Sequence, residues 1–240
     1  MTNELTFSII IPVFNGEDLI QECLNSILEQ DYKDYEIIIK DGLSSDKTVE
    51  IIKKNINNRI KIISSPDSGI YDAMNQSIKI ARGKWIYFMG SDDQLYDNFV
   101  LTNIAKELDR DSSIDILYGD FFSNNQFYIN KFNWKIIKGN SLNHQSIFYN
   151  NKIFINNYYD TNYKLAADYK FNIQLYKNKR RSRKVPYVIT KYGFQGLSSI
   201  NKNIGLIECE RSRIEVYGSI KGRIFNFLIR IYNYLKILVL

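Results

Sequence analysis

The sequence predicts an α/β fold in which helices flank a central, mostly parallel, Rossmann-like sheet. Short apolar runs alternate with segments of helical periodicity throughout the first half of the chain. The runs are nearly continuous rather than alternating, which is typical of strands that are buried on both faces in parallel sheets. Small or acidic polar residues follow these runs, so the polar groups are expected at the strand ends.

The first βα unit shows the pattern in detail. Residues 7–13 form an apolar run, and Pro12 lies near its end, where a missing N–H costs little. Asn15-Gly16 is a turn signal, and acidic residues at 17–18 favour a helix start. One apolar stripe then recurs at helical spacing, through Ile20, Cys23, Leu24, Ile27 and Leu28.

The later elements repeat this alternation. Residues 35–40 predict a second strand that ends in Asp41-Gly42, and Ser44 or Ser45 is placed to cap a helix over 46–57. Strands separated by such helices form βαβ units and a parallel sheet. Further strands are expected at 59–63, 84–89 and 114–118, and further helices at 71–81, 97–108 and 167–176.

Composition excludes several classes of protein. The 240 residues carry a net charge of +6, which suggests an anionic partner without choosing among nucleic acid, phosphates and lipid headgroups. One histidine and two distant cysteines exclude a cysteine-rich zinc site, an HExxH metalloprotease and a disulfide scaffold. The two lone cysteines fit a reducing compartment. We expect no signal peptide and no membrane span, because the N-terminus is not basic and no run of about 20 apolar residues exists.

Polar clusters follow four successive predicted strands. Asn15 follows the first strand, Asp41 the second, residues 65–69 the third, and residues 91–93 the fourth. In open α/β sheets, ligands bind beyond the carboxyl ends of the strands, so these residues predict a binding crevice. The sequence contains neither GxGxxG after the first strand nor GxxxxGK[ST], which removes the usual support for dinucleotide binding and P-loop hydrolysis.

Asp92 and Asp93 form an adjacent carboxylate pair after the fourth predicted strand. Two such groups repel each other, and burial would raise their pKa unless a cation compensates. A divalent metal bound with a diphosphate would supply that compensation, because Mg²⁺ and Mn²⁺ prefer carboxylate, phosphate and water oxygens. The simpler interpretation of the pair is a helix N-cap or an acidic turn.

Four spaced segments carry a resemblance to a known family. FSIIIPVFNGE, EIIIKDGLSSDKT, PDSGIYDAMNQSIKIARGKWIYFMGSDD and the later AADY resemble, in order, the inverting glycosyltransferases of family 2, which have the GT-A fold. The similarity covers about residues 5–200 and is strongest over 7–93. It is closest to bacterial enzymes that extend O-antigen, capsule or exopolysaccharide repeat units.

The resemblance implies an activity, a cofactor and partners. The chain would transfer a hexose from a UDP-sugar, with Mn²⁺ or Mg²⁺, to a saccharide linked to polyprenyl diphosphate. It would form a GT-A domain over 1–200, with a nucleotide-binding half at about 5–120 and an acceptor-binding half at about 121–200. Residues 201–240 would add a helical extension that associates with the cytoplasmic face of the inner membrane.

The resemblance also implies the nucleotide site. Pro12, Phe14, Asn15 and Glu17 would line the uridine pocket, partly through backbone, and Asp41 would hydrogen-bond the uracil.

The resemblance implies that the acidic pair and one turn of small residues complete the site for the donor sugar nucleotide. Asp92 would contact the ribose or share the metal, and Asp93 would be the metal ligand. Ser68 and Gly69 would let the backbone approach the donor.

Asp168 in AADYK matches the general base of the family. Its simpler interpretation is a helix N-cap, and Asp160 and Asp120 are alternative bases. The chain departs from the family in two places, because Ala167 replaces a frequent glutamate and Met74 replaces a frequent arginine. The second change removes an expected contact to the diphosphate.

Four residues are weaker candidates for contact with the donor sugar or acceptor, namely Asp120, His144, Gln145 and Ser198. A lone histidine is more often structural, and the segment at 196–199 also fits an ordinary turn.

Two basic features indicate a membrane surface. Residues 177–184 form a positive run that also fits a nucleic-acid patch or a solvated loop. Residues 221–240 are apolar apart from one narrow polar stripe, which predicts an interfacial helix with basic residues toward the headgroups. A helix docked on the domain or in a homo-oligomer is the alternative. The stripe consists of Asn226, Arg230, Asn233 and Lys236.

A basic module that binds nucleic acid or another anionic surface without catalysis is the alternative function. Binders of single strands usually interleave aromatic and basic residues along a groove, whereas the aromatic residues here are dispersed. We therefore expect no nucleic-acid partner.

Overall fold

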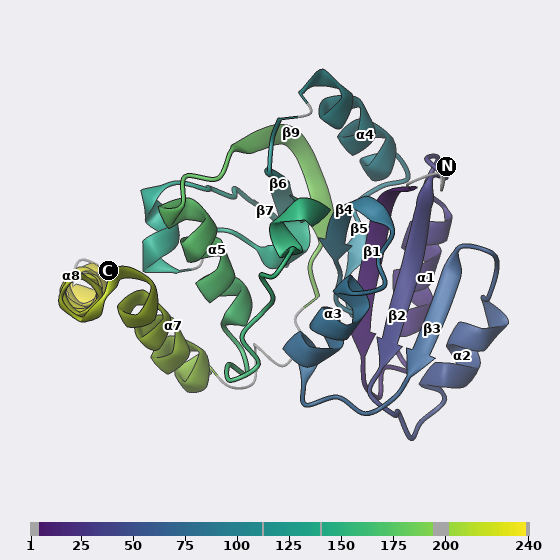
Figure 1. Ribbon diagram of the computed structural model, residues 1–240, viewed down its shortest axis with the longest axis horizontal. Coiled ribbons are helices and arrows are strands. Elements are labelled where there is room, and N and C mark those ends of the chain that lie inside the picture. The colour runs from purple at the N-terminus through teal and green to yellow at the C-terminus, as the bar shows by residue number, and fades with distance from the viewer. Residues whose placement is uncertain (1–4, 112, 140, 194–201, 239–240) are drawn as a thin grey trace.

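The computed structural model describes residues 5–111, 113–139, 141–193 and 202–238. One nine-stranded mixed sheet has the order β3-β2-β1-β4-β8-β6-β9-β5, with β7 paired to β6 (Figure 1). The strands are β1 Leu5–Val13, β2 Tyr35–Asp41, β3 Ile60–Ser64, β4 Gly83–Phe88, β5 Gln94–Leu95, β6 Ile116–Ser123, β7 Gln126–Tyr128, β8 Ile147–Asn150 and β9 Ser182–Lys191.

The helices pack around this sheet as the sequence pattern predicts. The α-helices are α1 Ile20–Leu28, α2 Thr48–Lys54, α3 Ile70–Ile78, α4 Val100–Arg110, α5 Ala167–Lys177, α7 Lys202–Tyr217 and α8 Ser219–Leu238. Short 3₁₀ turns are η1 Trp134–Lys138, η2 His144–Ser146 and η3 Asn151–Phe154. In Figure 1, α7 and α8 lie beside α5 at the left, on the opposite side of the molecule from β3 and α2.

The first half forms the predicted parallel sheet. β1 pairs in parallel with β2 and β4, and β2 pairs in parallel with β3. Alternate residues of β1 point into two different apolar clusters, with Phe7 and Ile9 in one and Ile10 in the other. All three side chains are fully buried, which confirms a strand covered on both faces.

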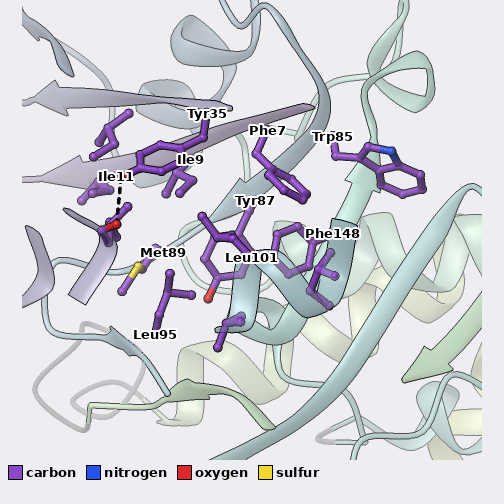
Figure 2. Packing of buried hydrophobic residues seen from close by; sticks show 14 of the residues in the cluster. Phe7, Ile9, Ile11, Tyr35, Trp85, Tyr87, Met89, Leu95, Leu101 and Phe148 are labelled. Atoms are coloured by element: carbon purple, nitrogen blue, oxygen red, sulfur yellow. Dashed lines mark hydrogen bonds between the residues drawn. The ribbon is translucent and has the colours of Figure 1, made fainter. Parts of the chain in front are cut away.

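Aromatic packing joins the two halves of the sheet. β8 pairs antiparallel with both β4 and β6, so the chain after residue 119 continues the same sheet. The Tyr87 ring of β4 stacks on the Phe148 ring of β8 with centroids 4.5 Å apart, and Phe7 meets Phe148 edge-on (Figure 2). β5, β7 and β8 run in the direction opposite to the other strands, which all share one direction. The sheet is therefore mixed.

The predicted cap of the second helix is wrong. Neither Ser44 nor Ser45 caps α2, which begins at Thr48 rather than 46 and ends at Lys54 rather than 57. The Ser44 hydroxyl instead accepts the N–H of Asn15, and the Asp46 carboxylate accepts the N–H of Thr48 at 3.0 Å. The two serines belong to a polar loop that precedes the helix.

We predict that Gly83→Ala destabilises the fold. A Cβ at Gly83 would lie 2.3 Å from the backbone nitrogen of Ser8, and the neighbouring strand cannot yield as a side chain would. Overpacking of this kind costs about 2 kcal/mol or more of unfolding free energy, measured by urea denaturation. The matched control is Gly205→Ala in α7, where no described atom from outside the surrounding turns of the helix lies within 4 Å of the new Cβ. That change should leave stability unchanged or increase it by up to about 1 kcal/mol. Equal stabilities for the two variants would contradict the packing of β4 on β1.

Candidate active site

The loops after β1 and β2 hold each other at one edge of the sheet. Asn15 has a left-handed backbone, with φ 50°, which asparagine tolerates better than most residues. Its side-chain oxygen accepts the N–H of Ser45 at 2.9 Å. The Glu17 carboxylate accepts the N–H of Lys47 at 2.9 Å. Asn15 and Glu17, both predicted nucleotide-site residues, therefore join by hydrogen bonds the two loops that would surround a nucleotide.

The two remaining candidates of this segment differ in exposure. Pro12 is buried within β1 opposite Lys40 of β2. The Phe14 side chain is 64% exposed at the end of the strand, beside Gly42. Phe14 is therefore the residue of the pair whose ring is accessible to a ligand.

Asp41 is the last residue of β2 and lies at the same edge of the sheet. It is fully buried, and its two carboxylate oxygens accept the hydroxyl of Ser64 at 2.5 Å and the N–H of Ser44 at 3.1 Å. The preceding Lys40 is also fully buried, and its ammonium contacts Asp67 at 3.1 Å and the carbonyl of Ser65 at 2.6 Å. The sequence analysis missed Lys40, although a lysine at the end of the buried run EIIIK is a usable signal.

The predicted small-residue turn lies between β3 and α3. Gly69 has φ 127°, which favours glycine, and no atom lies within 4 Å of the position of a Cβ. The N–H of Ser68 donates to the Asp72 carboxylate at 3.0 Å. The N–H of Gly69 donates to the Asp67 carboxylate at 3.1 Å. Ser68 and Gly69 are both exposed, and their approach to a donor stays a prediction.

The two members of the acidic pair have different environments. Asp93 is fully buried, and its oxygens accept the N–H groups of Gly90 and Gly193, each at 2.9 Å. Burial, followed by the charge of Asp92, raises the pKa of Asp93 to about 7. Asp92 is only partly buried. The geometry thus gives Asp93 two backbone partners and leaves Asp92 as the more accessible carboxylate.

Asp168 lies in the first turn of α5 and is half-buried. Its Oδ1 accepts a hydrogen bond from the Tyr71 hydroxyl at 2.7 Å. Tyr71 belongs to α3, which begins directly after Gly69. Burial and the charge of Asp168 raise the pKa of Tyr71 well above its usual range, so the phenol stays protonated and donates. Tyr71 was not predicted as a site residue, although it lies in the segment PDSGIYDAMN that carries part of the family resemblance.

His144 is a buried residue whose hydrogen bonds are unmet. Its ring stacks on Phe88, with centroids 5.2 Å apart, and neither ring nitrogen has a partner within the described residues. Burial lowers the pKa of His144, and the charge of Asp168 acts in the opposite direction. The hydroxyl of neighbouring Tyr159 is likewise buried without a partner. Gln145 is partly exposed, and its backbone carbonyl accepts the Tyr87 hydroxyl at 2.7 Å.

The alternative bases are already paired with lysines. Asp120 of β6 lies 2.8 Å from the Lys184 ammonium, and Asp160 lies 2.7 Å from that of Lys170. Asp168 differs from both in that its hydrogen-bond partner is the neutral Tyr71 hydroxyl rather than an ammonium group. Ser198, like the whole segment at 196–199, lies outside the described residues.

Comparison with known proteins identifies the fold. The model superposes on crystal structures of S. aureus TarS with a TM-score of 0.71 at 22% identity, over 94% of this chain and 69% of that one. The TarS structure in complex with UDP-GlcNAc gives 0.72 at 20% identity, over 94% and 70%. A mannosyltransferase from Pyrobaculum calidifontis, in complex with GDP-Man and Mn²⁺, gives 0.70 at 15% identity, over 89% and 64%. The architecture is therefore that of a GT-A fold glycosyltransferase.

Sequence comparison identifies the family. The model of glycosyl transferase family 2 matches residues 8–183. A PGL/p-HBAD biosynthesis glycosyltransferase of Mycobacterium bovis is 32% identical over 211 residues, which cover 83% of this chain and 78% of that protein. The poly(ribitol-phosphate) beta-glucosyltransferase of Bacillus spizizenii is 40% identical over 123 residues, or 48% of this chain and 19% of that protein. The chain belongs to glycosyl transferase family 2.

We predict that Asp92→Asn stabilises the metal-free fold at alkaline pH. The folded protein holds the Asp93 proton up to about pH 7, whereas the unfolded chain releases it near 3.8, so stability falls as the pH rises between these values. Removing the charge of Asp92 reduces the stability that is lost when Asp93 ionises in the folded protein. We expect a gain of about 1 kcal/mol at pH 8 in EDTA, by urea denaturation, and none below pH 4.

The control is Asp109→Asn, which removes the same charge from an exposed position on α4. It should change stability by less than about 0.5 kcal/mol at either pH. If Asp92→Asn gave no more stability at pH 8 than at pH 4, the two carboxylates would not repel each other in the fold.

Proposed function

We propose that this enzyme transfers a hexose, with inversion, from a UDP-sugar to a saccharide carried on polyprenyl diphosphate. The observation that carries the proposal is the hydrogen bond from Tyr71 to Asp168. It places a half-buried carboxylate of α5 beside the start of α3, next to the loop that follows β3. This contact brings the proposed base, from the second half of the chain, close to the loop that follows β3 in the first half.

Asp168 is the general base in this proposal. Its Oδ1 is engaged by Tyr71, and no donor among the described residues occupies Oδ2. Oδ2 takes the proton of the acceptor hydroxyl as that oxygen bonds to C1 of the donor sugar. The bond between C1 and the diphosphate oxygen breaks on the opposite face, which inverts the anomeric centre.

The donor nucleotide occupies the edge at the ends of β1, β2 and β3. Phe14 offers an exposed ring beside Gly42, where a uracil can stack. Each oxygen of Asp41 carries one hydrogen bond and has the capacity to accept another from the uracil N–H. Asn15 and Glu17 hold the surrounding loops, and the turn at Ser68 and Gly69 lets backbone approach the diphosphate.

The residues at the end of β4 fit a divalent cation. Burial, followed by the charge of Asp92, raises the pKa of Asp93, and a bound Mn²⁺ or Mg²⁺ would favour the charged form of both carboxylates. The described residues contain no cluster of three or more His, Cys, Asp or Glu side chains for a metal, so substrate phosphates would complete the ligand set. Asp93 remains the proposed ligand, because each of its oxygens accepts one N–H and can still bind a cation, and the more accessible Asp92 would contact the ribose or share the metal. The bound cation would neutralise charge on the departing diphosphate.

The C-terminal helices provide the proposed membrane contact, in an orientation opposite to the expected one. The Asn226 side chain accepts the Arg213 guanidinium at 2.5 Å, and Arg230 pairs with Glu210 at 2.5 Å, so these polar residues face α7. The expectation that Arg230 points toward headgroups is wrong. The opposite side of α8 is apolar and exposed, through Ile220, Ile224, Phe227, Leu228, Ile231, Tyr234 and Leu235.

The charge of α8 favours an anionic lipid surface. The helix contains no acidic residue, and Lys221 and Arg223 are exposed near its start. An apolar face flanked by basic residues binds the headgroup region of a membrane. Among the described residues, no helix combines the length and the apolar character needed to cross a bilayer. We propose attachment to the cytoplasmic face of the inner membrane through residues 201–240, with the catalytic domain at 1–200.

We predict that Asp168→Asn abolishes transfer without abolishing donor binding. Loss of a general base costs about 10²–10⁴-fold in rate. The measurement is UDP release from a panel of UDP-hexoses, with Mn²⁺ and a synthetic lipid-diphosphate GlcNAc acceptor, beside donor affinity by calorimetry. Asp160→Asn is the matched control, because Asp160 pairs with Lys170 away from Tyr71. Equal turnover by Asp168→Asn and wild type would disprove the assignment of the base.

We predict that Phe227→Glu combined with Leu235→Glu releases the protein from anionic vesicles. Both side chains are more than half exposed, so the change leaves the fold intact. Each lost apolar side chain removes about 1.5–3 kcal/mol of burial free energy, so vesicle binding should fall at least about tenfold in flotation assays. The control is Phe99→Glu, which alters an exposed aromatic residue that precedes α4. Unchanged flotation of the double variant would rule out this face of α8 as the membrane contact.

A further inference from the structure

We propose that Glu208 of α7 is a positioning residue for Asp168, so α7 supports the helix that carries the proposed base. This inference rests on the proposed role of Asp168 as the base. Glu208 lies outside the stretch of residues 8–183 that matches the family model. No motif in the sequence marks it.

The Glu208 carboxylate binds three consecutive backbone amides. Oε1 accepts the N–H of Lys164 at 2.7 Å, and Oε2 accepts those of Leu165 and Ala166 at 2.8 and 2.9 Å. Glu208 is 8% exposed. Hydrogen bonds from N–H groups to a buried carboxylate are short and strong because the acceptor is charged.

These amides lead directly into the helix that carries the base. Ala166 is the N-cap of α5 and has no side-chain cap, so its own N–H takes a partner from outside the turn. Glu208 supplies that partner from another helix. Asp168 follows Ala166 by two residues, so the carboxylate of Glu208 fixes the turn that sets the position of the base.

Other contacts hold α7 in the position that this role requires. Arg213 is 4% exposed, and its guanidinium donates to the carbonyl of Ile137 at 3.1 Å and to the Tyr169 hydroxyl at 3.0 Å. Glu215 accepts the Tyr163 hydroxyl at 2.9 Å. These contacts lie on the side of α7 that faces α5 and η1, so α7 is anchored to the catalytic domain independently of the exposed face of α8.

Asp168 is therefore held from two sides. Tyr71 holds the Asp168 carboxylate by a hydrogen bond, and Glu208 holds the backbone that leads into the first turn of α5. A shift of about 1 Å in a reacting group costs about 10²-fold in rate. Loss of Glu208 should accordingly affect the chemical step rather than donor binding, because Glu208 hydrogen-bonds residues 164–166 and none of the proposed donor residues.

The test compares Glu208→Ala, Glu208→Gln and the control Glu210→Gln in the full-length protein. Glu210 is on the same helix but pairs with Arg230 of α8. We expect Glu208→Ala to lower kcat about 10²-fold with the donor KM within about twofold of wild type. Glu208→Gln keeps one acceptor oxygen and should recover much of the loss, and Glu210→Gln should match wild type. Hydrogen exchange of the backbone amides at residues 164–166 should be faster than wild type in Glu208→Gln and faster still in Glu208→Ala.

Three results would overturn the inference, namely wild-type kcat in Glu208→Ala, equal losses in kcat and donor affinity, or unchanged exchange at 164–166. If Glu208→Ala fails to fold, the kcat of Glu208→Gln and its amide hydrogen exchange at residues 164–166 test the inference instead. The proposed function fails separately, when Asp168→Asn turns over as fast as wild type. An inactive Asp168→Asn beside a fully active Glu208→Ala would refute only the role of Glu208.

Discussion

The hydrogen bond between the Tyr71 hydroxyl and Asp168 is the contact on which the proposed chemistry depends. It joins residues 97 positions apart and brings a carboxylate of α5 to the helix that follows the β3 loop. The phenol is buried and remains protonated, so it donates at any pH near neutrality. One carboxylate oxygen is thereby fixed and the other is left to accept a proton.

Around the ends of β2 and β4, the described residues include buried charges and polar groups without hydrogen-bond partners, and both cost stability. Lys40 is buried and must be compensated by Asp67 and by backbone carbonyls. Asp93 is buried beside Asp92, and His144 has no hydrogen-bond partner among the described residues. Unsatisfied or unpaired polar groups in a core cost free energy, and they persist where binding or catalysis requires them. Their concentration around the strand ends supports a functional crevice there.

The sequence allowed the framework of the first half to be predicted, because its strands and helices have distinct hydrophobic periods. Helix boundaries were less accurate, and the cap of α2 was wrong because Ser44 hydrogen-bonds across the loop to Asn15 instead. The candidates Asn15, Asp41 and Asp92 could be chosen because they follow strands, and parallel strand ends meet at one edge. Tyr71 and Glu208 could not be found in this way, since their roles depend on contacts between segments far apart in the chain. The orientation of α8 was also not predictable, because a polar stripe fits water, headgroups or the side chains of α7 equally well.

The stereochemistry of the product tests the central claim most directly. A single base at Asp168 predicts direct displacement at C1, so a donor whose sugar is α-linked to its diphosphate should give a β-linked product. The anomeric coupling constant, followed by NMR from the first turnovers, distinguishes the two configurations. A β-linked product is the result that we predict. An α-linked product would contradict the mechanism, because retention requires a second displacement that Asp168 as the sole base does not provide.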